Sequence, residues 1–229
     1  MSHGRTLLDL VKIEKMRKTL HADSLPSQLF RRMDESLDAE FYREPRFVTH
    51  IDDATIAALT QVYREWIAPG TAVLDLMSSW VSHLPPDVEY SRVVGLGMNR
   101  AELARNPRLH EFVVHDLNAT PTLPYEDMTF DAAINAVSIQ YLTRPVDVYA
   151  AVRRVLKPGG RAIVAMSHRC FPTKAVAAWH TLPAAERAAL VASYFELAGG
   201  YDAAEFVDRS PPGADPLWIV SARRSQSLR

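Results

Sequence analysis

The sequence contains a single cysteine, Cys170, which excludes an internal disulfide and favours a reducing compartment. Its 26 basic and 27 acidic side chains nearly cancel, so it has no general attraction to nucleic acid or to an anionic membrane. No apolar run approaches the ~20 residues of a transmembrane helix, and the first residues lack the apolar core of a signal peptide. We therefore expect a cytoplasmic protein that binds neither nucleic acid nor a membrane.

Two further absences concern chemical sites. The eight histidines are scattered and form no cluster with the spacing of zinc ligands, so we predict no metal site. No glycine stands between Gly70 and Gly95, and no G-x-G-x-x-G signature follows the first predicted strand. Both observations disfavour a nicotinamide-dependent oxidoreductase.

The sequence does contain short apolar runs that alternate with amphipathic segments. Strands are predicted at residues 72–75, 91–96, 110–115, 130–137, 161–167, 201–208 and 217–222. Helices are predicted at residues 54–67, from residue 100, and at residues 146–156 and 184–197. This alternation predicts an α/β fold with a mostly parallel, doubly wound sheet. The last two strands follow each other without a helix, so we expect an antiparallel hairpin at the sheet edge.

The first 50 residues differ in character, and we expect a helical extension, residues 1–50, beside one domain, residues 51–229. Residues 5–20 have the apolar spacing of an amphipathic helix, which would pack on the main body or on a partner. A second short helix is predicted near residues 25–33. Residues 41–47 are aromatic and basic, and Pro45 disfavours a helix there. This segment is either a packing strap or a lid that places Tyr42 at a substrate.

Several short motifs follow one another at a regular spacing. They are V-L-D-L at 73–76, V-V-G-L at 93–96, H-D-L-N at 115–118, L-P-Y-E-D-M-T-F-D at 123–131, L-K-P-G-G-R at 156–161 and A-G-G-Y at 198–201. Together, over residues 50–224, they resemble the class I S-adenosylmethionine (SAM)-dependent methyltransferases, in particular the type 11 methyltransferase-domain group. The resemblance implies a Rossmann-like fold, SAM as the cofactor, S-adenosylhomocysteine (SAH) as its product, and methyl transfer to a small molecule.

The resemblance also places SAM across the carboxyl ends of the first three strands. Asp75 would then face the methionine ammonium, or would only pin the backbone amides of the following loop. That loop is glycine-rich in the family, whereas here it contributes Met77, Ser78 and Ser79. Serine is small and donates from its backbone and its hydroxyl, so the loop remains a candidate cofactor site.

The end of the second strand departs from the family pattern more sharply. Gly97, followed by Met98, stands where the family has a carboxylate that binds the ribose hydroxyls. The nearest carboxylate, Glu102, is predicted on a helix and facing solvent. Asn99 offers only a neutral acceptor, and losing a charge-assisted pair weakens binding roughly 10- to 100-fold. On this interpretation, Gly97→Asp would restore the ribose contact.

The end of the third strand keeps the family pattern. Asp116 would accept a hydrogen bond from the adenine amino group, while the backbone N–H of Leu117 would meet a ring nitrogen. The alternative is an aspartate that only caps a helix or a turn.

Candidate catalytic and substrate residues follow the fourth and fifth strands. Asn135, Ser138, Gln140 and Tyr141 belong to the edge that faces methyl donor and acceptor in the family; Ser138 and Gln140 either polarise the acceptor or only form a turn. Beyond the fifth strand, His168 is a candidate base, and Arg169 and Lys174 are candidate partners of an acidic substrate, unless the loop is merely solvated. His83, beside Trp80, is a rival base or a packed side chain.

The leading interpretation is therefore a cytoplasmic methyltransferase with a small-molecule acceptor, for which a homodimer is left open. The alternative is a methyltransferase-like protein that binds SAM weakly or not at all and serves as a binding or regulatory subunit. Gly97 and the glycine-free loop favour the alternative, whereas Asp116 and the remaining motifs favour the enzyme.

Overall fold

The computed structural model describes residues 25–226, which form one seven-stranded sheet with helices on both faces. The strand order is β3-β2-β1-β4-β5-β7-β6. The strands are β1 (Ala72–Leu76), β2 (Arg92–Gly97), β3 (Glu111–Val114), β4 (Phe130–Ala136), β5 (Leu156–Met166), β6 (Glu205–Asp208) and β7 (Trp218–Arg223). Strands β1 to β5 pair in parallel, whereas β7 pairs antiparallel with both β5 and β6. The predicted mostly parallel sheet with an antiparallel edge hairpin is confirmed.

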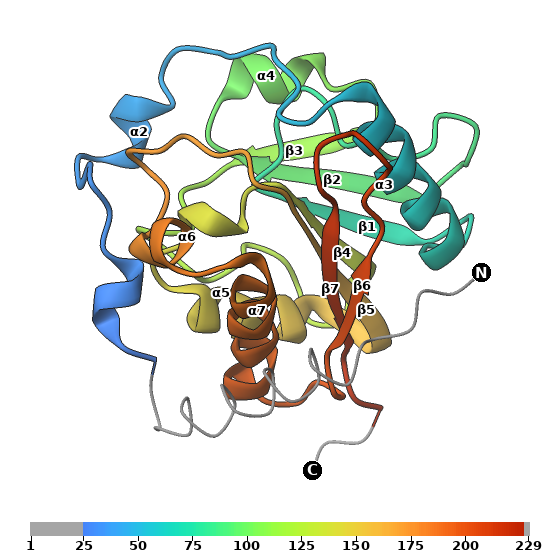
Figure 1. The fold of residues 1–229 in the computed structure, drawn as a ribbon. Helices are drawn as coiled ribbons and strands as arrows, with labels where there is room; N and C mark the ends of the chain where they lie inside the picture. The colour runs from blue at the N-terminus through green and yellow to red at the C-terminus, as the bar shows by residue number, and fades with distance from the viewer. Residues whose placement is uncertain (1–24, 227–229) are drawn as a thin grey trace.

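Helices cover the two faces of the sheet unequally. They are α2 (Asp38–Phe41), α3 (Asp53–Trp66), α4 (Arg100–Arg105), α5 (Pro145–Val155), α6 (Ala177–Thr181) and α7 (Ala184–Ala198), with 3₁₀ turns at Ser27–Phe30 and Ile139–Tyr141. Helices α5 and α7 lie together on one side of the sheet, and α3 lies on the other (Figure 1). Within residues 25–226, no helix combines the length and the apolarity needed to cross a bilayer.

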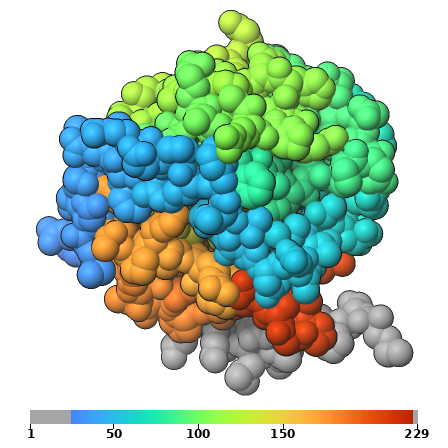
Figure 2. All heavy atoms as spheres, turned by 90° about the horizontal axis from the view of Figure 1, so that it is seen from above, coloured from blue at the N-terminus to red at the C-terminus, as the bar shows by residue number. Residues whose placement is uncertain are grey.

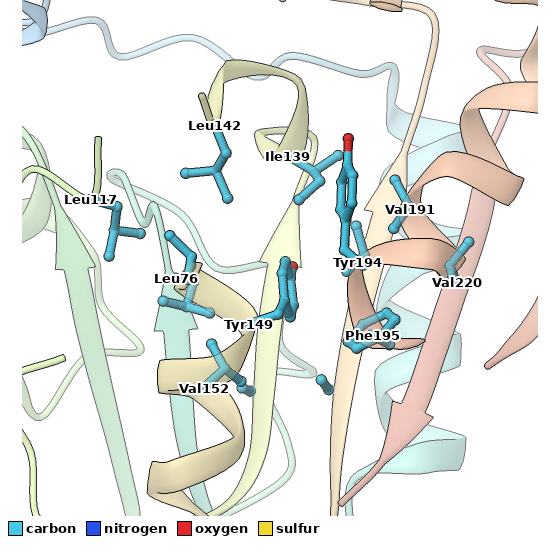
Figure 3. Close-up of a cluster of buried hydrophobic side chains, with 14 of the residues drawn as sticks. Leu76, Leu117, Ile139, Leu142, Tyr149, Val152, Val191, Tyr194, Phe195 and Val220 are labelled. Carbon is cyan, nitrogen blue, oxygen red and sulfur yellow. The ribbon is translucent and has the colours of Figure 1, made fainter. Parts of the chain in front are cut away.

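Side chains along each strand point alternately to the two faces of the sheet and contribute to two apolar cores. On β1, Leu74 and Leu76 pack toward α5 and α7, whereas Val73 packs toward α3. Figure 3 shows the larger core, where the ring centroids of Tyr149 and Phe195 lie 4.7 Å apart. Full burial of a large apolar side chain stabilises a fold by roughly 1.5–3 kcal/mol. Packing on both faces therefore fixes the register of the central strands.

Local sequence features set several helix ends. Asp52 caps α3, since its carboxylate accepts a hydrogen bond from Thr55 N at 2.9 Å. Helix α5 begins at Pro145, where the missing N–H leaves no intrahelical bond unmade. Helix α7 ends before Gly199, whose φ of +67° is unfavourable for other residues.

Residues 25–50, called the strap below, run across the edge of the sheet where the parallel strands have their carboxyl ends. Arg32 forms an isolated bridge with Val176, and Asp34 N donates to Thr173 O at 2.8 Å. Figure 2 shows this segment in blue, running over the molecule between the green and orange parts of the chain. The helix expected at residues 5–20 lies outside the described residues.

The topology prepares a binding place at one edge of the sheet. Strand β1 lies between β2 and β4. The chain adds β2 and β3 on one side of β1 and then crosses to add β4 and β5 on the other side. In open α/β sheets, such a switch point leaves a crevice beyond the carboxyl ends of the strands. The strap passes over this crevice.

Candidate functional site

A cavity opens at the carboxyl ends of β1 to β4, beneath the strap. The cavity has a volume of about 120 Å³. Predicted residues in its wall are Tyr42, Asp75, Met77, Ser78, Ser79, His83, Gly97, Met98, Asn99, Asp116, Leu117, Ser138 and Tyr141. Predicted residues that do not line it are Asn135, Gln140, His168, Arg169 and Lys174. The fold thus gathers most of the predicted cofactor residues at one place, while their roles stay predictions.

Asp75, near the end of β1, holds the loop that follows this strand. Its Oδ2 atom accepts hydrogen bonds from the hydroxyls of Ser78 and Ser82, both at 2.6 Å. Asn106 holds the same loop, because its Nδ2 donates to Ser79 O and to Ser82 Oγ, both at 2.9 Å. The carboxylate therefore pins the loop through serine hydroxyls rather than through backbone amides, and it also borders the cavity.

The loop turns tightly although it has no glycine. Met77 and His83 have φ angles of +54° and +56°, in the left-handed region that disfavours side chains. Val137, after β4, is a third cavity residue with positive φ, at +50°. Such strained residues persist where the surrounding contacts over-determine the backbone, and they cluster at functional sites.

The loop packs against a glycine of the neighbouring strand, Gly97 at the end of β2. Ser78 N donates to Leu96 O at 2.8 Å, which holds the loop against the end of β2. A Cβ atom at Gly97 would lie 2.1 Å from Ser78 O, although the φ of Gly97 is not positive. The backbone therefore leaves no room for a side chain here. The expectation that Gly97→Asp restores a ribose contact is wrong, because a close backbone contact requires the glycine.

The environment of Asp75 predicts an unusual dependence of stability on pH. Burial raises the pKa of Asp75 from 3.8 to about 7, against the opposing effect of the Ser78 and Ser82 hydroxyls. The folded chain thus keeps a proton that the unfolded chain loses above about pH 4. The stability that this proton contributes is complete below pH 4 and is lost as the pH rises to about 7. We expect the free energy of unfolding to fall by about 1.4 kcal/mol per pH unit over this window.

Urea denaturation of the wild type and of Asp75→Asn between pH 4 and 8 measures this contribution. The amide cannot titrate, so the difference in unfolding free energy between the two proteins should change with that slope. A difference that stays constant with pH would show that Asp75 is ionised in the folded chain.

Asn99 is committed to structural contacts at the end of β2. Its Oδ1 atom caps α4 by accepting from the backbone N–H groups of Ala101 and Glu102, at 2.9 and 3.2 Å. Its Nδ2 atom donates to the carbonyls of Tyr42 and Arg43, at 3.0 and 2.9 Å. Both lone pairs of the amide oxygen are used, so Asn99 is not the free ribose acceptor expected from the sequence. Instead it ties α4 to the strap.

Glu102 lines the cavity, which corrects the expectation that it faces solvent. Its Oε2 atom accepts from Ser79 Oγ at 2.6 Å, and its Oε1 atom accepts from Arg46 N at 2.7 Å. Each carboxylate oxygen keeps lone-pair capacity for a further donor. A carboxylate therefore stands near the end of β2 even though Gly97 carries none.

Asp116 borders the cavity, and only one of its two carboxylate oxygens is engaged by residues 25–226. Its Oδ1 atom accepts from the backbone N–H groups of Asn118 and Ala119, at 2.9 and 3.2 Å, so it does stabilise a turn. Within residues 25–226, neither Asp116 Oδ2 nor the backbone N–H of buried Leu117 has a hydrogen-bond partner. A free acceptor beside a free donor is what the predicted adenine contact requires.

The residues after β4 support the backbone more than the cavity. Ser138 borders the cavity, but its hydroxyl donates to Asn135 Oδ1 at 2.9 Å. Gln140 is buried, and its Nε2 atom donates to the carbonyls of Val137 and Arg169, at 2.9 and 3.2 Å. Gln140 therefore forms a turn, which is the second of the two roles considered from the sequence.

The charged residues after β5 do not line the cavity, so its wall does not support their predicted roles. His168 Nε2 and Arg169 Nε lie 3.3 and 3.2 Å from the carboxylate of Asp215, in the segment before β7. Lys174 is fully buried, with its Nζ 3.4 and 3.3 Å from the carboxylates of Asp34 and Asp38 in the strap. Each of these side chains contacts an acidic residue distant in sequence, and such partners cannot be identified from local spacing.

Sequence reasoning missed several cavity residues: Arg46, Val48, His50, Val81, Glu102 and Phe171. The guanidinium of Arg46 lies over the rings of Phe41 and Phe171, 4.6 and 5.3 Å from their centroids. The aromatic and basic composition of residues 41–47 was the available signal for this contact. No local pattern marks His50 or Phe171, because only the fold brings them together.

Comparisons with known proteins point to methyltransferases. A family model described as a methyltransferase domain matches residues 80–164. A demethylmenaquinone methyltransferase of Renibacterium salmoninarum is 31% identical over 109 residues, which are 45% of this chain and 44% of that protein. The chain thus spans less than half the length of the curated relatives it matches.

Solved structures share the fold at low sequence identity. The [4+2]-cyclase SpnF matches with a TM-score of 0.56 and 18% identity, over 74% of this chain and 81% of that one. A Haemonchus contortus phosphoethanolamine N-methyltransferase 2, solved in complex with SAM, matches with a TM-score of 0.54 and 14% identity. That match covers 76% of this chain and 53% of the other. These likenesses concern the fold alone, since one fold carries different reactions.

Proposed function

We propose that this chain, a class I SAM-dependent methyltransferase by its fold and its family match, transfers a methyl group from SAM to a small molecule. The observation that carries the proposal is the pairing of two unused groups, Asp116 Oδ2 and the Leu117 N–H, at the cavity beyond the carboxyl ends of the strands. No metal ion is part of the proposal.

Residues of this chain provide a contact for each part of SAM. Asp116 and Leu117 would hold the adenine, and Glu102 would accept from the ribose in place of the missing carboxylate at Gly97. Asp75 would face the ammonium group of the methionine part of SAM. The backbone N–H of Ser79, which has no partner in the described part of the chain, would donate to the carboxylate of the same methionine part. The bound sulfonium supplies a reactive methyl group and its own leaving group, so alignment provides much of the rate.

The strap would act as a lid over the acceptor. It contributes Tyr42, Arg46 and His50 to the cavity wall, and Asn99 anchors it to α4. A cavity that the strap covers favours a small molecule over a macromolecular acceptor. The demethylmenaquinone acceptor in the name of the Renibacterium relative is compatible with a small-molecule substrate.

Calorimetric titration with SAM and SAH tests the proposal, and the Asp116→Asn variant tests the adenine contact. The only oxygen of asparagine would be committed to the turn formed with Asn118 and Ala119, so the adenine amino group would lose its acceptor while the fold is kept. We expect Asp116→Asn to weaken SAM binding roughly 10- to 100-fold, equivalent to about 1.5–3 kcal/mol.

Asp53→Ala is the matched control, because Asp53 is an exposed aspartate of α3 outside the cavity. It should leave the affinity for SAM unchanged. Equal affinity in wild type and Asp116→Asn would remove the adenine assignment. A folded wild type that binds neither SAM nor SAH would favour the alternative of a binding or regulatory subunit.

A further inference from the structure

Part of the cavity remains unassigned by the cofactor contacts, and its wall is mainly aromatic. The strap supplies Tyr42 and His50, the turn after β4 supplies Tyr141, and the segment after β5 supplies Phe171. Phe171 stacks on Tyr141 with ring centroids 5.8 Å apart, and His50 meets Phe171 edge-on at 5.3 Å. Aromatic rings in a cavity wall pack favourably, stacked or edge-on, against the ring of a planar ligand.

His83 brings a second imidazole to the same cavity. Its φ is +56°, and Thr60 Oγ1 donates to its backbone carbonyl at 3.0 Å, which fixes the residue in this conformation. Its Nδ1 atom is buried and has no hydrogen-bond partner in the part of the chain that the structure describes. A strained backbone and an orphaned nitrogen both lower stability, so packing alone gives no reason for this histidine.

Both imidazoles are neutral near pH 7. Burial, together with the neighbouring His50, lowers the pKa of His83 to about 4. Burial also lowers the pKa of His50, with Arg46 acting in the same direction and Glu102 in the opposite one. A neutral imidazole keeps a lone-pair nitrogen, which accepts a hydrogen bond and then a proton. Neither His83 nor His50 uses that nitrogen in a hydrogen bond within residues 25–226.

We propose that His83 and His50 form the proton-accepting side of a methyl-acceptor subsite, and that the acceptor is a planar molecule whose methylated oxygen or nitrogen carries a hydrogen. This proposal rests on the proposed function. A lone pair of that oxygen or nitrogen attacks the methyl carbon, and the electrons of the carbon–sulfur bond go to sulfur. The electrons of the O–H or N–H bond stay on the acceptor, and its proton passes to the imidazole of His83.

A weakly basic imidazole is sufficient for this step. The acceptor atom gains positive charge as its bond to the methyl carbon forms, so its hydrogen becomes strongly acidic. A base that stays unprotonated at neutral pH is then always ready to take the proton. His50 lies on the strap, so the subsite is complete only while the strap covers the cavity.

Titration of the full chain, labelled with ¹⁵N-histidine and saturated with SAH, tests the subsite by NMR. The probes are phenol and aniline, each compared with its methylated counterpart, anisole or N,N-dimethylaniline. We expect at least one hydrogen-bearing probe to bind ten-fold or more tightly than its counterpart and to shift the ring nitrogen signals of His83 and His50. The counterparts keep the ring but lack the hydrogen, so they should not shift these signals.

Three variants complete the experiment. His83→Asn, which tolerates positive φ, and His50→Gln, which does not involve a strained backbone, should each remove the preference for the hydrogen-bearing probe. His168→Gln, outside the cavity, should keep it. The same variants should bind SAH as the wild type does.

The outcomes separate this proposal from the proposed function. If SAH binds but phenol and aniline bind no better than their counterparts, or the preference survives in both variants, the subsite proposal fails alone. If the wild type does not bind SAH, the proposed function fails and the subsite fails with it.

Discussion

Replacing Gly97 with aspartate is expected to destabilise the fold by about 3 kcal/mol and to weaken cofactor binding rather than to restore it. A Cβ atom at this position would lie 2.1 Å from Ser78 O, whereas nonbonded carbon and oxygen atoms need more than 3 Å. The obstacle is backbone, which cannot rotate away as a side chain can. The loop would have to leave the end of β2, breaking the hydrogen bond from Ser78 N to Leu96 O.

Alanine variants separate this effect from the added charge. Gly97→Ala should lose nearly as much stability as Gly97→Asp, because the clash begins at Cβ. Gly95→Ala is the matched control on the same strand, since its nearest contact is Leu109 Cδ1, at 2.4 Å, the end of a flexible side chain. Urea denaturation should show a clearly smaller loss for Gly95→Ala. A stable Gly97→Asp protein that binds SAM more tightly would restore the interpretation from sequence.

Replacing Lys174 with methionine is expected to lower the free energy of unfolding by about 3 kcal/mol. The ammonium group is fully buried and lies 3.3 Å from Asp38, whose carboxylate is also buried. It also donates to Ser36 O at 2.6 Å. Without it, Asp38 keeps, among residues 25–226, the ion pair with Arg32 at 2.7 Å and the hydrogen bond from Asn118, and the strap loses an anchor to the segment after β5. Loss of the buried ammonium leaves the carboxylate of Asp38 with one cation instead of two and removes the cation beside Asp34, which packing by methionine does not compensate.

Arg169→Met is the matched control, because the sequence assigned Arg169 and Lys174 the same role. The Arg169 side chain is 58% exposed, so its ion pair with Asp215 should contribute less than about 1 kcal/mol. Denaturation measures both losses, and limited proteolysis should detect a loosened strap in Lys174→Met only. Equal and small losses in the two variants would show that Lys174 does not hold the strap.

The site residues that could be predicted from the sequence lie at the carboxyl ends of strands. Asp75 lies near the end of β1 and Asp116 lies in the loop after β3, two parallel strands on either side of β2, and a parallel sheet gathers such ends at one edge. The cavity borders both residues for this reason. The conformations of Asn99 and Gln140 were not predictable, since each amide is used by backbone groups from other segments.

The sequence alone determined the mostly parallel sheet and its antiparallel edge hairpin. Apolar runs of strand length, Asp52 before α3 and Gly199 after α7 are local features, and local backbone preferences and burial act on them directly. Only the tertiary structure decided which polar side chains face the cavity. His50, Glu102 and Phe171 reach it because the strap, α4 and the segment after β5 meet there. Hydrogen bonds and ion pairs form with the nearest partner in space, and sequence spacing does not encode that distance for segments over a hundred residues apart, such as Lys174 and Asp38.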